Sequence, residues 1–253
     1  MKFNSHEYQK YAIEYIKTHP VAAILLGCGL GKTSIALTAI DDMLHDSFEV
    51  RKVLIVAPIR VAKVSWPDEI QKWDHLSDLK YAVAVGTQEE RIAALQADAD
   101  IYIINRENLS WLIDESGLPF DFDMCVLDEL SSFKNWQSKR FKSFMKVRPK
   151  LNRVIGLTGT PSSNGLMDLF AEFRCLDMGE RLGRFIGQYR NSYFRHDGGS
   201  VSDVQSHSGG QANRSSRENG GWIYWIPFQR QRRNAAGGHA LGTPVQQYGR
   251  SIQ

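Results

Sequence analysis

The chain has 253 residues, a hydrophobic content of 42% and a formal net charge of +3. This length suits one large domain or one domain with a tail, and the hydrophobic share is sufficient for a real core. No apolar run approaches the ~18 to 20 residues of a membrane span, and the first ten residues lack the apolar core of a signal peptide. We therefore expect no membrane partner and a cytoplasmic location. The small net charge leaves a nucleic-acid partner open, because local patches decide that question.

Three cysteines, Cys28, Cys125 and Cys175, are widely spaced and form no C-x-x-C pair. This pattern excludes a disulfide framework and a zinc site, and we expect each cysteine to be a small packing residue. Cys28 lies close to a predicted helix N-terminus, where a thiolate is stabilised, so a reactive thiol stays open as an alternative.

The first elements are a helix and a buried strand. Residues 6–18 place apolar side chains at helical spacing, and residues 21–26 form an apolar run that suits a strand buried on both faces. Gln9 lies on this helix. Judged by periodicity alone, Gln9 is a solvated polar position.

A glycine loop follows that strand and leads into a second predicted helix, from about Lys32 to His45. Amides of such a loop, the helix N-terminus and the Lys32 ammonium all present positive charge to a triphosphate, while the Thr33 hydroxyl suits Mg²⁺. The general pattern G-x-x-x-x-G-K-[ST] requires glycine at position 26, where this chain has leucine. An incidental glycine turn is the alternative interpretation. The loop glycines are Gly27, Gly29 and Gly31.

Strand and helix patterns then alternate along the chain. This order predicts an α/β fold with a parallel sheet and helices on both faces, in which ligands gather at the carboxyl ends of the strands. The strand patterns lie at 52–58, 81–85 and 101–104, and the helical patterns at 61–73, 88–96 and 107–114.

Two further motifs follow predicted strands. Asp128 and Glu129 end an apolar run, so Asp128 is a candidate Mg²⁺ ligand and Glu129 a candidate for orienting the attacking water. Acids also favour the first turn of an ordinary helix, which is the alternative. Thr158, Gly159 and Thr160 end a later strand pattern, where their hydroxyls are suited to sense the γ-phosphate; an ordinary turn is again the alternative.

With these three motifs in order, residues 1–195 resemble the N-terminal RecA-like lobe of superfamily-two helicases. The resemblance is greatest to the Swi/Snf-type branch of DNA translocases, including short phage and bacterial members. Segments 29–33, 128–135 and 157–164 resemble motifs I, II and III of that branch. Leu26 and Gly27 depart from it, because they stand where the family usually has an acidic pair.

The resemblance implies a P-loop NTPase fold that binds ATP and Mg²⁺, in the host cytoplasm if a phage encodes the chain. It implies that Gln9 reads the adenine edge, which reverses the interpretation from periodicity. The implied site residues fall into four groups: catalytic Lys32, Asp128 and Glu129; nucleotide-binding Gln9, Gly27, Gly29, Leu30, Gly31, Lys32, Thr33 and Ser34; metal-binding Thr33 and Asp128; and coupling Thr158, Gly159 and Thr160.

The resemblance also implies contacts with the phosphate backbone of DNA, independent of base sequence. Segments 56–60 and 103–109 resemble motifs Ia and Ib. Each candidate DNA contact, listed at the end of this paragraph, is equally consistent with a solvated surface charge. Trp66 and Trp73 fit a core role better than a base-stacking role. The candidate DNA contacts are Arg60, Lys63, Arg106, Lys134 and Asn135.

Residues 196–253 differ in character, being rich in Gly, Ser, Gln and Arg. This composition favours disorder; an Arg-rich segment that grips nucleic acid and the product of a shifted reading frame are the alternatives. Only residues 222–226 offer a strand-length apolar run. The family uses a second RecA-like lobe, for which this chain has no room.

The function expected from the sequence is the ATP-binding lobe of a DNA-dependent ATPase that couples hydrolysis to movement on DNA. A P-loop kinase or nucleotide switch, and a non-catalytic nucleic-acid-binding remnant, are the alternatives. DNA structure preference, polarity and the choice between unwinding and translocation do not follow from these residues.

Overall fold

The computed structural model describes residues 1–160, 165–197, 200–203 and 224–225. Seven strands form one sheet in the order β3-β4-β2-β5-β6-β1-β9, and every neighbouring pair is parallel. The α/β class with a parallel sheet is thus confirmed. The strands of the sheet are β1 (Val21–Leu25), β2 (Val53–Ala57), β3 (Tyr81–Ala84), β4 (Ile101–Asn105), β5 (Met124–Asp128), β6 (Arg153–Thr158) and β9 (Tyr224–Trp225).

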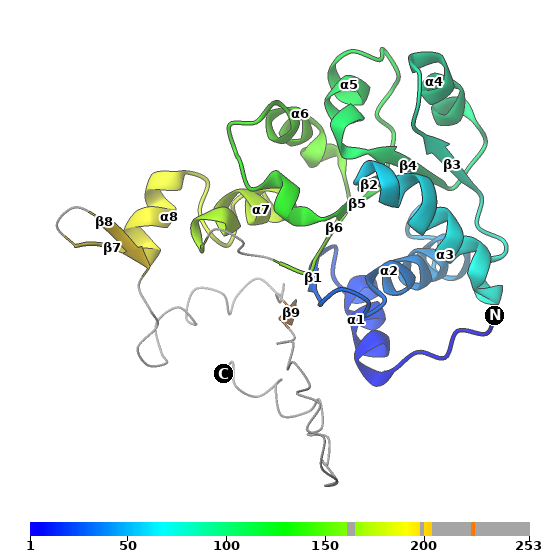
Figure 1. Ribbon diagram of the computed structural model, residues 1–253, viewed down its shortest axis with the longest axis horizontal. Helices are drawn as coiled ribbons and strands as arrows, with labels where there is room; N and C mark the ends of the chain where they lie inside the picture. Colours follow the sequence, from blue (N-terminus) through cyan, green and yellow to red (C-terminus); the bar gives the residue numbers. More distant parts are fainter. Residues whose placement is uncertain (161–164, 198–199, 204–223, 226–253) are drawn as a thin grey trace, which may run out of the picture.

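Helices cover both faces of the sheet (Figure 1). Helices α1, α2 and α3 pack on one face, and α5, α6 and α7 pack on the other, with α4 beside β3. Alternate residues of each central strand enter the two cores, as the side-chain period of a strand requires. The helices are α1 (Glu7–Thr18), α2 (Lys32–Asp41), α3 (Trp66–Lys72), α4 (Gln88–Gln96), α5 (Leu109–Asp114), α6 (Lys139–Val147), α7 (Met167–Asp177) and α8 (Ile186–Tyr193).

The central strands form because most of their residues are apolar, and β2, β4 and β6 are also rich in β-branched side chains. All five residues of β2, Val53–Ala57, are buried, which is the pattern of a parallel strand covered on both faces. Such a strand tolerates no exposed face, so the crossover helices must lie on both sides of it.

Two helical predictions differ from the structure. Residues 61–73 do not form one helix: a π-helical turn at Val61–Ser65 precedes α3, and Val64 is 54% exposed rather than buried. The helix predicted to run to about His45 is α-helical only as far as Asp41. A π-helical turn, Asp42–Asp46, follows it.

Helix α6 has no counterpart among the sequence predictions. The Ser138 hydroxyl caps it by accepting a hydrogen bond from the Phe141 amide, and Phe141 and Phe144 are buried beneath it. A serine followed by apolar side chains at helical spacing is an N-terminal signal that the pattern already contained.

Residues 186–194 pack against α7. Phe170, Tyr189 and Phe194 form a small apolar cluster, and the Tyr189 hydroxyl donates a hydrogen bond to the Leu166 carbonyl. An antiparallel pair follows, β7 (Phe194–Asp197) with β8 (Ser200–Asp203). The boundary proposed at residue 195 stays a prediction, and the expected disorder or frame shift concerns residues that mostly lie outside the described ranges.

None of the helices in the described ranges is long and apolar enough to cross a membrane.

Candidate nucleotide-binding site

The sheet topology brings the three sequence motifs to one edge. Strands β1, β6 and β5 are neighbours, and the loops that carry the motifs all leave their carboxyl ends. Leu25 of β1 is in register with Thr158 of β6, and Asp128 of β5 with Leu157. The glycine loop, the acidic pair and the threonine turn are therefore adjacent, although about 130 residues separate the first from the last in sequence.

The glycine loop is shaped for an anion. Gly29 and Gly31 have φ of 79° and 75°, which side-chain-bearing residues rarely adopt, and a Cβ on Gly31 would lie 2.6 Å from the Gln9 Nε2 atom. Lys32 Nζ donates to the Leu26 carbonyl at 2.9 Å and to the Gly27 carbonyl at 3.1 Å. An ammonium has three N–H donors, so one donor of Lys32 is left to point at a ligand.

Gln9 of α1 packs against this loop and is only 7% exposed, so the interpretation as a solvated position is wrong. Its Oε1 atom accepts from the His6 amide at 2.9 Å, and its Nε2 atom makes a long contact with the Leu30 carbonyl at 3.5 Å. The Tyr8 hydroxyl donates to the same carbonyl at 3.2 Å. Helix α1 therefore fixes one side of the loop.

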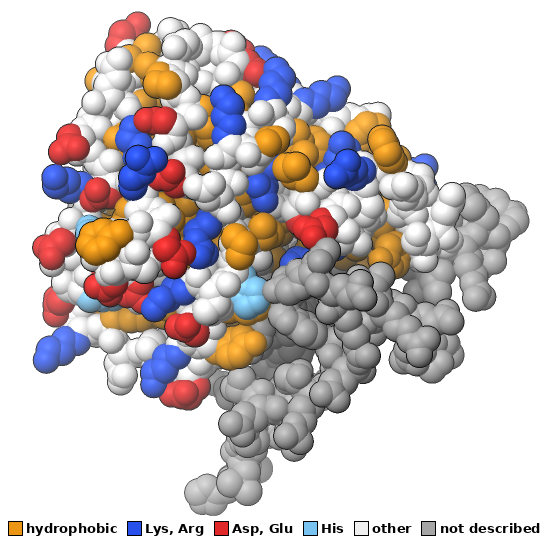
Figure 2. All heavy atoms as spheres, turned by 180° about the vertical axis from the view of Figure 1, so that it is seen from behind, with side chains coloured by type: hydrophobic (Ala, Val, Ile, Leu, Met, Phe, Trp, Pro, Cys, Tyr) orange, Lys and Arg blue, Asp and Glu red, His pale blue; other side chains and the backbone are white. Residues whose placement is uncertain are grey.

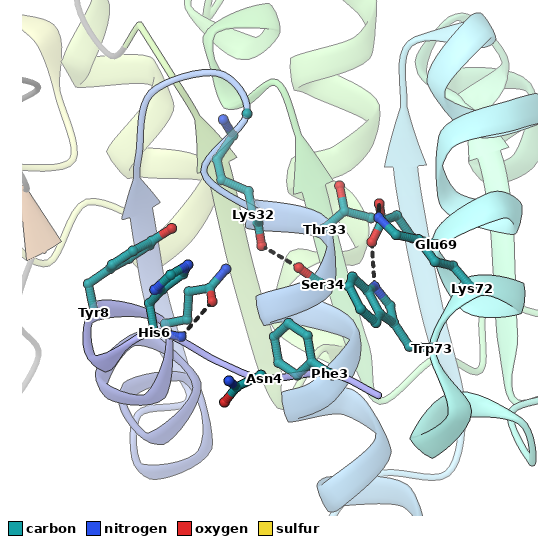
Figure 3. Close-up of a pocket in the computed structure, with 13 residues that line it drawn as sticks. Phe3, Asn4, His6, Tyr8, Lys32, Thr33, Ser34, Glu69, Lys72 and Trp73 are labelled. Carbon is teal, nitrogen blue, oxygen red and sulfur yellow. Dashed lines mark hydrogen bonds and ion pairs between the residues drawn. The ribbon is translucent and has the colours of Figure 1, made fainter. Parts of the chain in front are cut away.

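A pocket of about 440 Å³ opens beside the loop. Figure 3 shows its lining: His6 and Tyr8 on one side, Glu69, Lys72 and Trp73 on the other, and the start of α2 between them. Of the predicted nucleotide-binding residues, the pocket gathers Gln9, Gly29, Gly31, Lys32, Thr33 and Ser34. The Ser34 hydroxyl itself donates to the Gly31 carbonyl at 3.0 Å.

Asp128 is a partly buried carboxyl with two fixed donors. The Trp66 indole N–H donates to Oδ2 at 2.9 Å, and the Glu129 amide donates to Oδ1 at 3.0 Å. Burial raises the pKa of Asp128, while the Trp66 hydrogen bond and the Lys32 charge act against that rise. Trp66 is fully buried, as expected, but its contact with Asp128 is a site role that periodicity did not reveal.

Glu129 has a left-handed backbone, with φ of 57°. A non-glycine residue is strained in this region, and such strain gathers at functional sites. Its Oε1 atom accepts from the Ser131 hydroxyl at 2.6 Å and from the Thr158 hydroxyl at 3.2 Å. The second carboxylate is therefore oriented from two sides.

Thr158 connects the glycine loop with the acidic pair. It is fully buried; its carbonyl accepts from the Leu26 amide at 3.2 Å, and its hydroxyl donates to Glu129 and accepts from the Thr160 amide at 3.2 Å. A Cβ on Gly159 would lie 3.3 Å from the Leu26 carbonyl oxygen. Residues 161–164, the rest of the motif III segment, lie outside the described ranges. We call residues 26–33 with Asp128, Glu129 and Thr158 the phosphate cradle.

The donor set of the cradle fits Mg²⁺. The Thr33 hydroxyl and the Asp128 carboxylate offer hard oxygen atoms, which that ion prefers. In the described part of the chain, no three His, Cys, Asp or Glu side chains gather into a metal-binding group. A magnesium ion would therefore complete its shell with phosphate and water oxygens.

The candidate DNA contacts follow the carboxyl ends of β2, β4 and β5, on the same edge as the cradle. Arg60 and Lys63 are exposed, and Arg106 donates from Nε to the Glu107 carboxylate at 2.9 Å. Lys134 forms an ion pair with Asp168 at 3.8 Å. The Asn135 side-chain oxygen accepts from the amide two residues ahead, so it stabilises its own turn.

Charge on the visible back of the molecule is mixed. Figure 2 shows acidic and basic side chains interspersed over that face rather than separated by sign.

Glu172 was not found from the sequence patterns, and Cys28 differs from the role expected for it. Glu172 of α7 is 1% exposed, and its Oε1 atom has no hydrogen-bond partner among the described residues. Burial, and then the nearby Asp168 charge, raise its pKa to about 8, with Lys134 acting against the rise and Glu129 adding to it. Cys28 is exposed, so the packing role expected for it is wrong, whereas Cys125 and Cys175 are buried as expected.

Known proteins are similar to this chain in sequence. Residues 8–180 match the family model described as the SNF2-related domain. Protein p41 of Acyrthosiphon pisum secondary endosymbiont phage 1 is 35% identical over 199 residues, which cover 76% of this chain and 43% of that protein. An uncharacterised ATP-dependent helicase of Mycoplasma genitalium is 27% identical over 67% of this chain and 16% of its own length.

A solved structure agrees with the fold. The Sulfolobus solfataricus SWI2/SNF2 ATPase core in complex with dsDNA aligns with a TM-score of 0.64 and 25% identity, over 76% of this chain and 39% of that one. The chain spans less than half the length of each of these three proteins.

Proposed function

This chain belongs to the SNF2-related domain family, and on that premise we propose that it is the ATP-binding lobe of a DNA-dependent ATPase of the helicase or translocase type. The observation that carries the proposal is the continuous connection through Thr158, which joins the glycine loop at Leu26 to the Glu129 carboxylate. A site that only bound nucleotide would need no such connection between the phosphate loop and the acid that faces the attacking water.

Each residue of the cradle has a proposed task. The Lys32 ammonium neutralises the β- and γ-phosphates, and Glu129 aligns the water that attacks the γ-phosphate. Thr33 and Asp128 hold Mg²⁺, which when bound neutralises the charge that develops on the phosphate oxygens. Thr158 and Thr160 pass the state of the γ-phosphate to the loops that face DNA.

DNA is the proposed macromolecular partner. The structural relative from Sulfolobus solfataricus was solved with dsDNA, and the candidate contacts Arg60, Lys63, Arg106, Lys134 and Asn135 follow strands on the edge that holds the cradle. We propose that these side chains bind the phosphate backbone without reading base sequence. The phage relative supports action in the cytoplasm of a host cell.

A second RecA-like lobe would complete the ATP site by supplying arginines to the γ-phosphate. Such arginines are worth about 10³ to 10⁵ in rate, so a polypeptide of residues 1–253, assayed without such a lobe, is expected to bind ATP weakly and to hydrolyse it very slowly. Turnover at the rate of a two-lobe enzyme, abolished by Lys32→Ala, would contradict this expectation.

The test of the proposed function is ATP turnover by the purified chain with no DNA, with single-stranded DNA and with double-stranded DNA. We expect slow turnover that DNA stimulates and that Lys32→Ala lowers by about 10²- to 10³-fold. Turnover indifferent to DNA but dependent on a small acceptor would instead indicate a kinase or nucleotide switch. Salt-sensitive DNA binding unaffected by ATP or by Glu129→Gln would indicate a non-catalytic remnant.

A further inference from the structure

The pocket beside the phosphate cradle has a second wall that phosphate chemistry does not require. This wall consists of Glu69, Lys72, Trp73 and Phe3, at the end of α3 and on the N-terminal segment (Figure 3). It faces the side formed by His6 and Tyr8 across the first turn of α2. The inference developed here rests on the proposed ATP site and concerns what this wall recognises.

The Glu69 carboxylate is held in a fixed position. Its Oε2 atom accepts a hydrogen bond from the Trp73 indole N–H at 2.6 Å, and its Oε1 atom accepts from Lys72 Nζ at 3.0 Å. The Lys72 ammonium also lies 4.4 Å from the centroid of the Trp73 ring. Each carboxylate oxygen has capacity for more than one hydrogen bond, so both retain an accepting position toward the pocket.

The N-terminal segment fixes this wall relative to α1. The Phe3 ring meets the Trp73 ring edge to face, with centroids 5.1 Å apart, and the Met1 carbonyl accepts from the Asp74 amide at 3.0 Å. The same segment then leads into α1, whose Gln9 reaches the glycine loop. One stretch of chain therefore connects the two sides of the pocket, which favours a pocket of defined width.

The chemistry of the wall selects the part of a nucleotide that can occupy it. A carboxylate only accepts hydrogen bonds, so it repels phosphate oxygens and ring nitrogens with lone pairs, and it favours a donor. The hydroxyls of a ribose are donors on the atoms that link the phosphates to the base. Acidic side chains in other nucleotide sites bind ribose hydroxyls in this way.

We propose that Glu69, held by Lys72 and Trp73, accepts a hydrogen bond from the ribose 2′-hydroxyl and makes this site selective for ribonucleotides over deoxyribonucleotides. Glu69 is 26% exposed at the side chain, so it is accessible from the pocket while still partly shielded from water. Lys72 and Trp73 act as positioning residues, since they touch the carboxylate and not the sugar hydroxyl.

The test is isothermal titration calorimetry of the full chain with ATP, with 2′-deoxy-ATP and with purine riboside triphosphate, which lacks the 6-amino group. The wild-type chain is expected to bind ATP about tenfold more tightly than 2′-deoxy-ATP, as suits a hydrogen bond to a charged acceptor. Glu69→Ala is expected to remove this preference by weakening ATP binding alone. Retained binding of 2′-deoxy-ATP then serves as the evidence that the variant is folded.

Two further variants complete the design. Trp73→Phe keeps the ring but removes the donor to Glu69, so it should lose part of the preference for ATP. Asp68→Asn, at the adjacent and exposed position of α3, is the matched control and should leave the preference unchanged.

The outcomes separate this inference from the proposed function. Binding of ATP that depends on Lys32, with an equal ratio of ATP to 2′-deoxy-ATP affinity in the wild type and Glu69→Ala, would overturn the ribose assignment and leave the proposed function intact. If Glu69→Ala changed only the preference for ATP over purine riboside triphosphate, Glu69 would be assigned to the amino group of the base. That result would also overturn the ribose assignment. Absence of any Lys32-dependent nucleotide binding would overturn both.

Discussion

Two parts of one sheet edge hold their polar side chains in different ways. In the phosphate cradle, the Lys32 side chain donates to its own loop, and the Glu129 carboxylate accepts from Ser131 and from Thr158 of the next loop. Beyond β2, the Arg60 and Lys63 side chains are exposed and make no hydrogen bond or ion pair with another residue in the described ranges. The cradle is thus preorganised for a small ligand of fixed geometry, whereas the Arg60 and Lys63 side chains keep the freedom needed to follow a flexible, repeating phosphate backbone.

Glu172 lies at the boundary between these two parts. Its buried carboxyl is close enough to Glu129 of the cradle and to Lys134 of the candidate DNA contacts for both charges to affect its pKa. The difference between the cradle and the candidate DNA contacts can therefore be tested by variants in the cradle, at Glu172 and among the exposed cations.

The largest effect is expected from Lys32→Ala. Loss of the ammonium removes the main positive charge aimed at the phosphates, so turnover should fall by about 10²- to 10³-fold. ATP hydrolysis measured with labelled substrate checks this expectation. Lys142→Ala, which removes an exposed lysine of α6, should leave turnover unchanged; an equal loss in both variants would point to a general charge effect.

The second effect is on stability and comes from Glu172→Gln. The pKa of Glu172 is about 8 in the folded chain against an ordinary value of 4.5. Between these values the folded chain keeps a proton that the unfolded chain has released, so the free energy of unfolding falls as the pH rises through that window.

Glutamine keeps the shape of the side chain and removes its titration. At about pH 9 the variant should be more stable than the wild type by about 2 kcal/mol, and at about pH 5 the difference should be smaller. Urea unfolding at both pH values measures this change. Glu14→Gln, on the exposed side of α1, is the control, and an identical pH dependence for the wild type and Glu172→Gln would refute the assignment.

The third effect comes from Trp66→Phe, which keeps an aromatic ring but removes the donor to Asp128. The Trp66 hydrogen bond lowers the pKa of Asp128 against the effect of burial, so its loss should raise that pKa further. The ionised form binds Mg²⁺, and activity should therefore be lost at a higher pH than in the wild type as the solution is acidified. The Mg²⁺ requirement should rise by about tenfold.

Mg²⁺ titrations of turnover at several pH values provide the measurement. Trp111→Phe, on α5 at the other face of the sheet, offers a matched control. If Trp66→Phe lost activity at the same acidic pH as the wild type, the indole would only fill space.

The smallest effect is expected from Lys63→Ala. Loss of one phosphate contact should weaken DNA binding about twofold to threefold for any base sequence and reduce the salt slope by about one. Fluorescence anisotropy at several salt concentrations measures both quantities. Lys150→Ala lies before β6, at the opposite edge of the sheet, and should have no effect; equal losses would mean that the carboxyl edge is not the DNA-binding side.

The fold was predictable because its strands are short and apolar and are clearly bounded by polar or turn-forming residues. Runs such as 52–58 and 101–104 need burial on both faces, and that requirement leads to a parallel sheet covered by helices. The irregular residues 61–65 and helix α6 were not predicted. In the first case the apolar Val64 fits the helical pattern of the sequence but is exposed in the structure, and in the second the capping signal at Ser138 was present but unused.

The sequence by itself determined the phosphate-binding chemistry, because glycines, a lysine and a hydroxyl act through the local backbone that they shape. It also determined the order of motifs that resembles the SNF2 branch. Tertiary structure alone decided which distant side chains complete that chemistry. Trp66 reaches Asp128, Glu69 faces the pocket, and Glu172 is buried near Glu129. These contacts depend on strand order and helix packing, which bring together residues that no local spacing relates.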